Sequence, residues 1–243
     1  MLYLIAKNII PNGFKFYIKR FLGIDRFSMF RALQRCKKRG IQISSVIDVG
    51  ASSGSWSKLC LNIYPKAFYL LIEAQPIRRE QLESFKELVP NSNFCIAAAG
   101  DKNGKLYFDA SEIEGGLASH SVIENISNLI EVDSYSIDYL VERDNIVGPY
   151  LIKLDTHGFE LPILEGAQKT LANSNLVIIE SYNQKLTNDS LKFYELCTYM
   201  SKLGFEPIEI VDVSHRLYDH SLWQMDIFFI KNDRSEFKYK KYS

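Results

Sequence analysis

Strand-like and helical patterns alternate along this chain from Ser45 onward, and this alternation limits the fold more than any other feature. Continuous β-branched and apolar runs predict buried strands, and apolar residues at helical spacing predict the helices between them. The predicted strands cover 45–49, 68–73 and 93–98, and the predicted helices cover 56–64 and 77–88. Strands that alternate with helices form parallel sheets covered on both faces. The sequence therefore predicts an α/β fold built on a mostly parallel sheet.

The rest of the chain divides around this alternating part. Residues 1–44 carry apolar positions at helical spacing, which predicts a helical lead-in packed on the main domain. The main domain is predicted to span 45–232, and residues 233–243 are predicted to form a flexible tail. Within the main domain, the alternation of strands and helices stops over 101–149. A connection of this length in a compact α/β unit is usually functional. We interpret it as an insertion of short strands and a loop that covers the substrate pocket.

The first predicted strand runs into a loop of small residues, 50–54, here called the glycine loop. Gly50 and Gly54 allow a sharp bend and a close approach to a ligand, and free N–H groups at the following helix start can meet a polar ligand. Asp48 precedes the first glycine, where its carboxylate would repel phosphate and attract a cation. This placement favours S-adenosylmethionine, with its positive sulfonium and ammonium groups, over the pyrophosphate of a dinucleotide.

The second predicted strand ends in Glu73, about twenty residues after the glycine loop, where comparable folds hydrogen-bond the ribose hydroxyls. Glu73 is therefore the ribose candidate. Alternatively, it begins the turn that follows and caps the next helix.

A third acid, Asp155, ends the apolar run 150–155 and leads into Thr156-His157-Gly158. Ligands of open α/β sheets lie outside the carboxyl ends of the strands, so Asp155 should face the same crevice as Asp48 and Glu73. Each acid could instead be a helix N-cap, since aspartate is favoured there. Capping, however, does not explain why all three acids lie at strand ends.

Together these segments resemble the FkbM-type methyltransferases, a branch of the Rossmann-like enzymes that use S-adenosylmethionine. The similar segments lie within about 45–231 and comprise 46–51, 72–76, 97–100, 136–138, 151–161, 164–167, 177–180 and 224–229. The resemblance implies a Rossmann-like class I methyltransferase fold, with a seven-stranded, mostly parallel sheet whose last strand is antiparallel. It implies S-adenosylmethionine as the cofactor. The cofactor-binding residues that follow are Asp48, Gly50, Ala51, Ser53, Gly54, Glu73, Ala74 and Asp155.

The resemblance also implies methyl transfer to a hydroxyl oxygen, in relatives often on a sugar or polyketide. Such a reaction depends mainly on alignment of donor and acceptor, but a base must take the hydroxyl proton. His157 is the natural candidate, because imidazole titrates near neutrality and follows a strand end; Asp155 could orient it or accept the proton itself. The chain departs from the family here, since an acidic residue often stands where His157 precedes Gly158. His157 could instead cap the next helix and point away from the methyl group.

Other features narrow the choice of partners. Lysine and arginine together number 29, as do aspartate and glutamate, so no overall field favours nucleic acid. The apolar start of the chain is too short and too interrupted to insert stably in a membrane, although the basic aromatic face of residues 14–21 could touch a membrane surface. Four separated cysteines indicate a reducing compartment, the cytoplasm. No residues have the spacing of a zinc site, and no bound metal is expected, although Asp155 with Glu180 could hold magnesium.

The sequence thus predicts a cytoplasmic, S-adenosylmethionine-dependent O-methyltransferase that acts on a small-molecule or glycan hydroxyl, with a sugar of a surface glycan or secondary metabolite favoured. One alternative is a non-catalytic cofactor-binding module, because the departure at His157 could have removed turnover. A less favoured one is a nucleotide-cofactor oxidoreductase, because the Gly-x-Gly-x-x-Gly pattern is incomplete. No pattern in 101–149 selects the acceptor or the oligomeric state.

Overall fold

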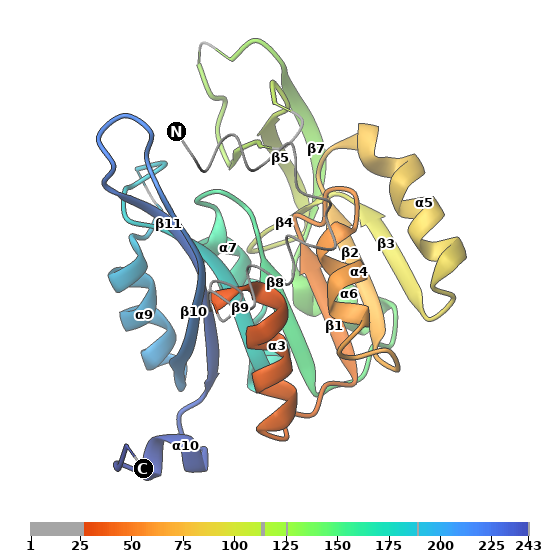
Figure 1. Cartoon of the computed structure of the whole chain (residues 1–243). Helices are drawn as coiled ribbons and strands as arrows, with labels where there is room; N and C mark the ends of the chain where they lie inside the picture. The colour runs from red at the N-terminus through yellow and green to blue at the C-terminus, as the bar shows by residue number, and fades with distance from the viewer. Residues whose placement is uncertain (1–26, 113–114, 125, 189, 243) are drawn as a thin grey trace, which may run out of the picture.

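The computed structural model describes residues 27–112, 115–124, 126–188 and 190–242 (Figure 1). A seven-stranded sheet forms its centre. Across the sheet, its strands are β10 (Phe205–His215), β11 (Leu222–Lys231), β9 (Ser174–Tyr182), β8 (Tyr150–Leu154), β1 (Ser45–Val49), β2 (Phe68–Glu73) and β3 (Ser92–Ile96). Neighbours pair in parallel except at β11, which is antiparallel to both β9 and β10. The predicted fold class and its antiparallel last strand are confirmed.

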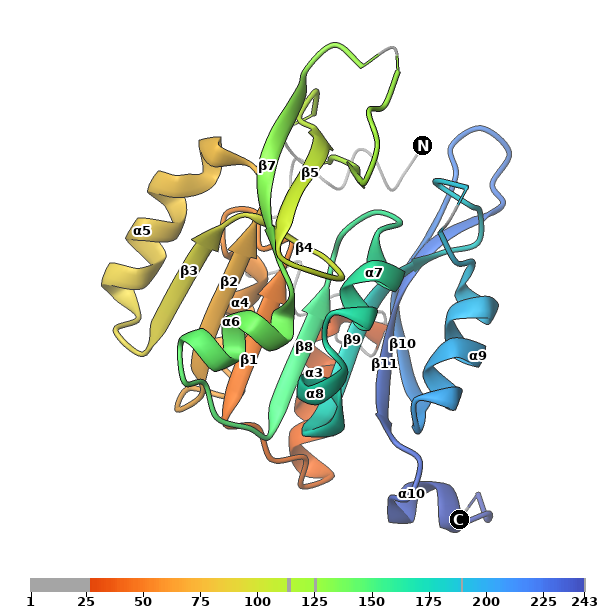
Figure 2. The same cartoon turned by 180° about the vertical axis from the view of Figure 1, so that it is seen from behind.

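Helices cover both faces of this sheet (Figures 1 and 2). One face carries α3 (Met29–Lys38), α4 (Ser55–Leu61) and α5 (Arg79–Leu88); the other carries α6 (Ile137–Arg143), α7 (Glu160–Glu165), α8 (Gln168–Ala172) and α9 (Phe193–Lys202). Successive strand residues point to opposite faces. In β1, Val46 belongs to the apolar core beneath α3, whereas Ile47 and Val49 belong to the core beneath α6. The continuous apolar runs in the sequence therefore fill two cores at once.

A second sheet rises above the carboxyl ends of the parallel strands (Figures 1 and 2). Its strands, in order, are β4 (Ala98–Ala99), β7 (Leu129–Tyr135), β5 (Gly104–Asp109) and β6 (Ala118–Ser119). The sequence predicts strand-like pieces at 105–109 and 129–132 but not their pairing into a sheet. Gln75, which follows β2, donates through Nε2 to the backbone oxygens of Glu112 at 3.2 Å and Gly115 at 2.8 Å, which ties this insertion to the main domain.

The chain ends of the described part pack against each other. Glu209 of β10 accepts two hydrogen bonds of 2.8 Å from Arg35 of α3, so the lead-in helix is fixed to the sheet. The helices predicted before residue 27 lie outside the described residues. The predicted flexible tail contains a short helix, α10 (Ser235–Lys238), and Arg234 beside it donates to the backbone oxygen of Arg39 at 3.0 Å. In the ranges that the structure describes, no helix has both the length and the apolar character needed to cross a membrane.

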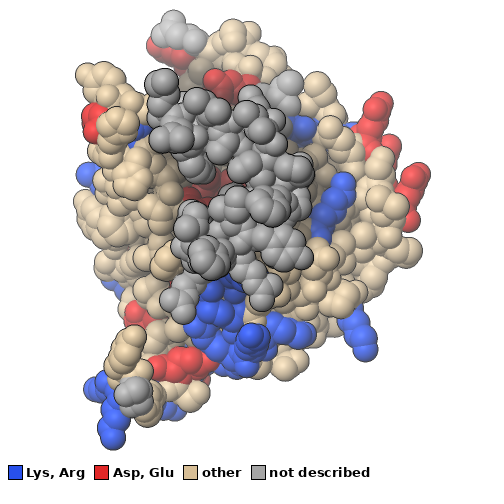
Figure 3. Space-filling view, in the orientation of Figure 1, with Lys and Arg blue, Asp and Glu red and all other residues tan. Residues whose placement is uncertain are grey.

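Basic side chains gather on the surface at the foot of α3 (Figure 3). The last turn of this helix carries Arg35, Lys37 and Lys38. Cations are stabilising at a helix C-terminus, where the backbone carbonyls carry partial negative charge. The position of these basic side chains thus has a local structural explanation.

Candidate active site

A cleft of about 400 Å³ opens at the carboxyl ends of β1, β2, β8 and β9. Residues of the second sheet, Phe108 and Ala118 among them, form part of its wall. Polar and loop residues of the main domain that line it are Gly50, Ser52, Glu73, Ala74, Gln75, Asp155, Thr156, His157, Glu180 and Gln224. Open α/β sheets bind their ligands at this edge, and the volume is that of a small-molecule site. The cleft is therefore the candidate active site.

The glycine loop lies at this edge because Gly50 has no side chain. Its φ is +74°, and a Cβ there would overlap the backbone oxygen of Asp155. The loop backbone also bonds to the neighbouring strand, since the N–H groups of Gly50 and Ala51 donate to Ile72 at 2.9 and 3.1 Å. Gly50 therefore allows the end of β1 to pack directly on the end of β8. From the sequence, this glycine was explained only by the bend of the loop and by close approach to a ligand.

Glu73 connects the glycine loop to the turn after β2. Its carboxylate accepts hydrogen bonds from the backbone N–H of Ser52 at 2.7 Å and of Gln75 at 2.8 Å. Burial raises the pKa of this carboxyl, while the two backbone hydrogen bonds act against the increase. Gln75, not Glu73, is the N-cap of the short helix that follows, Pro76–Arg78. Glu73 thus lines the cleft and joins the glycine loop to the turn after β2 as a hydrogen-bond acceptor.

Asp48 does not face the cleft, contrary to the expectation from the sequence. Its side chain is buried, and its carboxylate accepts a hydrogen bond of 2.6 Å from the hydroxyl of Ser57 in α4. The reason is strand geometry: Ile47 and Val49 point toward α6, so the residue between them points toward α4. Of the other cofactor candidates in this region, Gly50, Glu73 and Ala74 line the cleft, whereas Ala51, Ser53 and Gly54 do not.

Because Asp48 is buried, it should make the stability of the protein depend on pH. Burial raises its pKa from 3.8 to about 7, despite the hydrogen bond from Ser57. Between about pH 4 and pH 7 the folded state therefore binds more protons than the unfolded state, and stability falls as pH rises. At pH 8 we expect the free energy of unfolding of Asp48→Asn to exceed that of the unchanged protein by about 2–4 kcal/mol. At pH 4 we expect this difference to disappear. Urea unfolding at both pH values measures the difference; an equal difference at the two would contradict the assignment.

Three side chains from the ends of β8 and β9 form what we call the acid–histidine cluster: Asp155, His157 and Glu180. One ligand atom of each lies within 4.8 Å of the others, and all three residues line the cleft. His157 has a φ of +53°, and its Nε2 lies 3.7 Å from Oε2 of Glu180. The helix after it, α7, begins at Glu160 without a side-chain cap. The alternative in which His157 caps this helix and points away therefore does not describe the structure.

The environment of Glu180 differs from that of its neighbour Asp155. Glu180 is buried and accepts hydrogen bonds from Tyr182 at 2.9 Å and Gln224 at 2.6 Å. Burial, and then the negative charge of Asp155, raises the pKa of Glu180 to about 8. Burial would also raise the pKa of Asp155, but the nearby ammonium of Lys153 lowers it. The sequence analysis named Glu180 only as a possible magnesium ligand, because the strand pattern did not show that it would face His157.

Lys153 holds Asp155 from within the sheet. It is 1% exposed, and its Nζ lies 3.2 Å from the carboxylate of Asp155 and 3.0 Å from that of Asp226 in β11. These carboxylates raise the pKa of Lys153 even though burial would lower it. Sequence reasoning assigned no role to Lys153, although a lysine inside an otherwise apolar strand is a signal that it must have a buried partner.

Comparisons with known proteins found a matching family model and several similar proteins. The model of the methyltransferase FkbM domain matches residues 48–207. The hexuronic acid methyltransferase AglP of Haloferax volcanii is 26% identical over 161 residues, which cover 65% of this chain and 65% of that protein's length. The crystal structure of methyltransferase FkbM from Methylobacillus flagellatus is 18% identical, with a TM-score of 0.49 over 76% of this chain and 43% of that one. Aeropyrum pernix fibrillarin, solved with bound S-adenosylmethionine, is 10% identical, with a TM-score of 0.44 over 78% of this chain and 68% of that one.

Proposed function

This chain belongs to the FkbM methyltransferase family, whose model matches more than half of it, and we propose that it transfers a methyl group from S-adenosylmethionine to a hydroxyl oxygen. The acceptor we propose is a small molecule or glycan, and a sugar in particular. The name of the Haloferax volcanii relative, a hexuronic acid methyltransferase, supports a sugar acceptor.

The observation that carries the proposal is the charge of the cleft. Glu73, Asp155 and Glu180 line it, and no lysine or arginine does so among the described residues. Such a wall attracts a cation and repels phosphate. S-adenosylmethionine carries a sulfonium and an ammonium group, whereas a nicotinamide dinucleotide carries a pyrophosphate. The charge therefore favours a methyltransferase over the oxidoreductase alternative.

Two groups of cleft residues suit two parts of this cofactor. Glu73 already accepts hydrogen bonds from Ser52 and Gln75, and its remaining lone pairs can accept from ribose hydroxyls. The acid–histidine cluster provides the negative charge of Asp155. The residues present therefore fit S-adenosylmethionine, which when bound supplies an electrophilic methyl group.

The chain itself must orient the acceptor and take its proton. Bound S-adenosylmethionine would supply the methyl group to the acceptor oxygen, and the hydroxyl proton of the acceptor would have to be taken up by the chain. We assign the uptake of this proton to the acid–histidine cluster, with His157 and Asp155 as the catalytic residues. Lys153 keeps Asp155 ionised and in place, as a positioning residue. The second sheet, through Phe108 and Ala118, limits the access of water.

His157 provides the test of this assignment. Removal of a group that takes part in proton transfer costs about 10²–10⁴-fold in rate. We therefore expect His157→Gln to lower the transfer of the methyl group to the acceptor by at least about 100-fold, with the affinity for the cofactor changed less than about threefold. The assay uses cofactor labelled in its methyl group, presented with pools of sugars and glycans.

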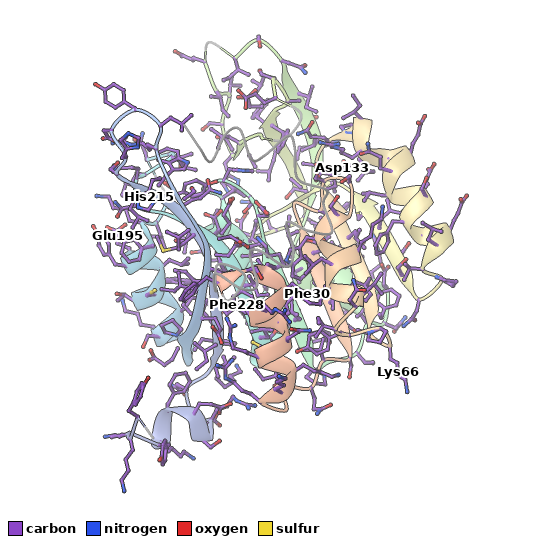
Figure 4. All side chains as sticks on the ribbon, in the orientation of Figure 1. Phe30, Lys66, Asp133, Glu195, His215 and Phe228 are labelled. Carbon is purple, nitrogen blue, oxygen red and sulfur yellow. The ribbon has the colours of Figure 1, made fainter. Side chains whose placement is uncertain are left out.

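The matched control is His215→Gln, because His215 is exposed at the end of β10, away from the cleft (Figure 4). This variant should keep full activity. If the unchanged protein binds the cofactor but methylates no acceptor, the non-catalytic module becomes the better account. If His157→Gln retains full activity, the role given to the histidine is wrong.

A further inference from the structure

We propose that the acid–histidine cluster binds a divalent cation of the magnesium or manganese class, a site whose catalytic role rests on the proposed function. Ligand atoms around such a cation lie about 2.1 Å from it, and therefore about 3–4 Å from one another. The three ligand atoms of Asp155, His157 and Glu180 are within 4.8 Å of one another. If these three atoms moved about 1 Å closer together, they would form the protein's part of the coordination sphere.

The types of ligand support this class of cation. Carboxylate ligands suit magnesium and manganese, and two of the three ligands here are carboxylates; a zinc site of the structural type would need four ligands, usually with thiolates. The cluster supplies three ligands from one wall of the cleft. About half of an octahedral sphere would therefore remain open toward the cleft, for water or for hydroxyl groups of the acceptor.

Both carboxylates are already held by neighbouring donors. Glu180 is fixed by the hydroxyl of Tyr182 and the amide of Gln224, and Asp155 is fixed by the ammonium of Lys153. Ligands of metal sites typically have such outer partners, which set their orientation. The two carboxylates are therefore oriented in advance by residues that take no part in the cluster itself.

The balance of charge gives an argument that does not depend on the shape of the cluster. Asp155, Glu180 and Asp226 are three acids, and within the described ranges Lys153 is the only lysine or arginine that forms an ion pair with any of them. Glu180 is 8% exposed and the side chain of Asp226 is 14% exposed. Buried charges are costly unless they are compensated. A divalent cation on the cluster would add positive charge beside these acids and would stabilise the ionised form of Glu180.

This inference narrows the acceptor class. A cation that faces the cleft with open positions would bind a hydroxyl oxygen of the acceptor and lower its pKa. Two neighbouring hydroxyls could occupy two open positions, which favours a vicinal diol, a common feature of sugars. With the cation bound, the ring nitrogen of His157 serves as a ligand, and the carboxylate oxygen of Asp155 that does not bind the cation can accept the hydroxyl proton. The inference revises the expectation from sequence that no metal is present, because the sequence did not show that His157 and Glu180 lie together.

The test is the binding of Mn²⁺ to the full chain, in the absence of cofactor and after treatment with a chelator. Electron paramagnetic resonance detects free Mn²⁺ directly. We expect one Mn²⁺ per chain, and we expect His157→Gln and Glu180→Gln each to weaken its binding at least about tenfold. The controls are His215→Gln and Glu83→Gln, which change exposed residues outside the cleft and should bind as the unchanged protein does. Thermal unfolding of each variant verifies that it is folded.

The outcomes separate this inference from the proposed function. Absence of Mn²⁺ binding, or binding that both cluster variants retain, overturns the cation site even if methyl transfer proceeds. Binding of Mn²⁺ that depends on His157 and Glu180 supports the site, even if S-adenosylmethionine does not bind. Should Glu180→Gln fail to fold, Asp155→Asn takes its place in the comparison.

Discussion

Gly50→Ala is expected to destabilise the protein by about 3 kcal/mol or more and to abolish binding of S-adenosylmethionine. The backbone at Gly50 has a φ of +74°, a region that costs an L-residue about 1–2 kcal/mol. The new Cβ would also overlap the backbone oxygen of Asp155, which is not the end of a flexible side chain. The ends of β1 and β8 must then separate, and this moves the glycine loop and Asp155 out of the cleft. Chemical unfolding and a cofactor titration measure the two effects.

Gly204→Ala is the matched control for this change. Gly204 has a φ of +81°, and a Cβ there would meet no atom within 4 Å. This variant therefore carries the backbone cost of alanine without the overlap, and should lose only about 1–2 kcal/mol. Equal losses of stability in the two variants would mean that contact between the glycine loop and Asp155 is not what requires Gly50.

Glu73→Gln is expected to weaken the binding of S-adenosylmethionine about 100-fold. The carboxylate accepts from the N–H groups of Ser52 and Gln75, so a glutamine amide must turn its NH₂ group toward one of these donors. The variant also removes the negative charge that a ribose hydroxyl would bond to. A lost hydrogen bond to a charged group costs about 1.5–3 kcal/mol, and about 2.7 kcal/mol corresponds to 100-fold in affinity.

Calorimetric titration of the cofactor measures this change. Glu83→Gln, a substitution of the same kind on the exposed side of α5, is its control and should leave the affinity unchanged. If Glu73→Gln binds the cofactor within threefold of the unchanged protein, Glu73 does not hold the ribose. Its role would then be limited to joining the glycine loop to the turn after β2.

The parallel strands of the fold can be predicted from continuous apolar runs in the sequence. These runs are informative because the strands are buried on both faces of the sheet. The bounds of β1 and β2 agree with the predicted 45–49 and 68–73. The second sheet was not predicted, since the pairing of β5 with β7 joins residues far apart in sequence, such as Leu106 and Val132. Pairing of this kind depends on the register that the completed fold selects.

The candidate site was predictable where position along a strand decides it, and less so where the direction of a side chain decides it. Glu73 and Asp155 follow from the rule that ligands lie at the carboxyl ends of parallel strands. Asp48 also lies at the end of a strand. Side chains alternate between the two faces of the sheet along a strand, however, and Asp48 points to the face that α4 covers. The partners of Lys153 and the approach of Glu180 to His157 arise between strands, so no single segment reveals them.

The most direct test of the account is the titration of S-adenosylmethionine and S-adenosylhomocysteine into the unchanged protein, with NADH as the comparison ligand. We expect both sulfur ligands to bind in the micromolar range, about −8 kcal/mol, and the acidic lining of the cleft predicts that NADH does not bind. A folded protein that binds neither sulfur ligand, or that binds NADH more tightly, would contradict the assignment of this cleft to methyl transfer.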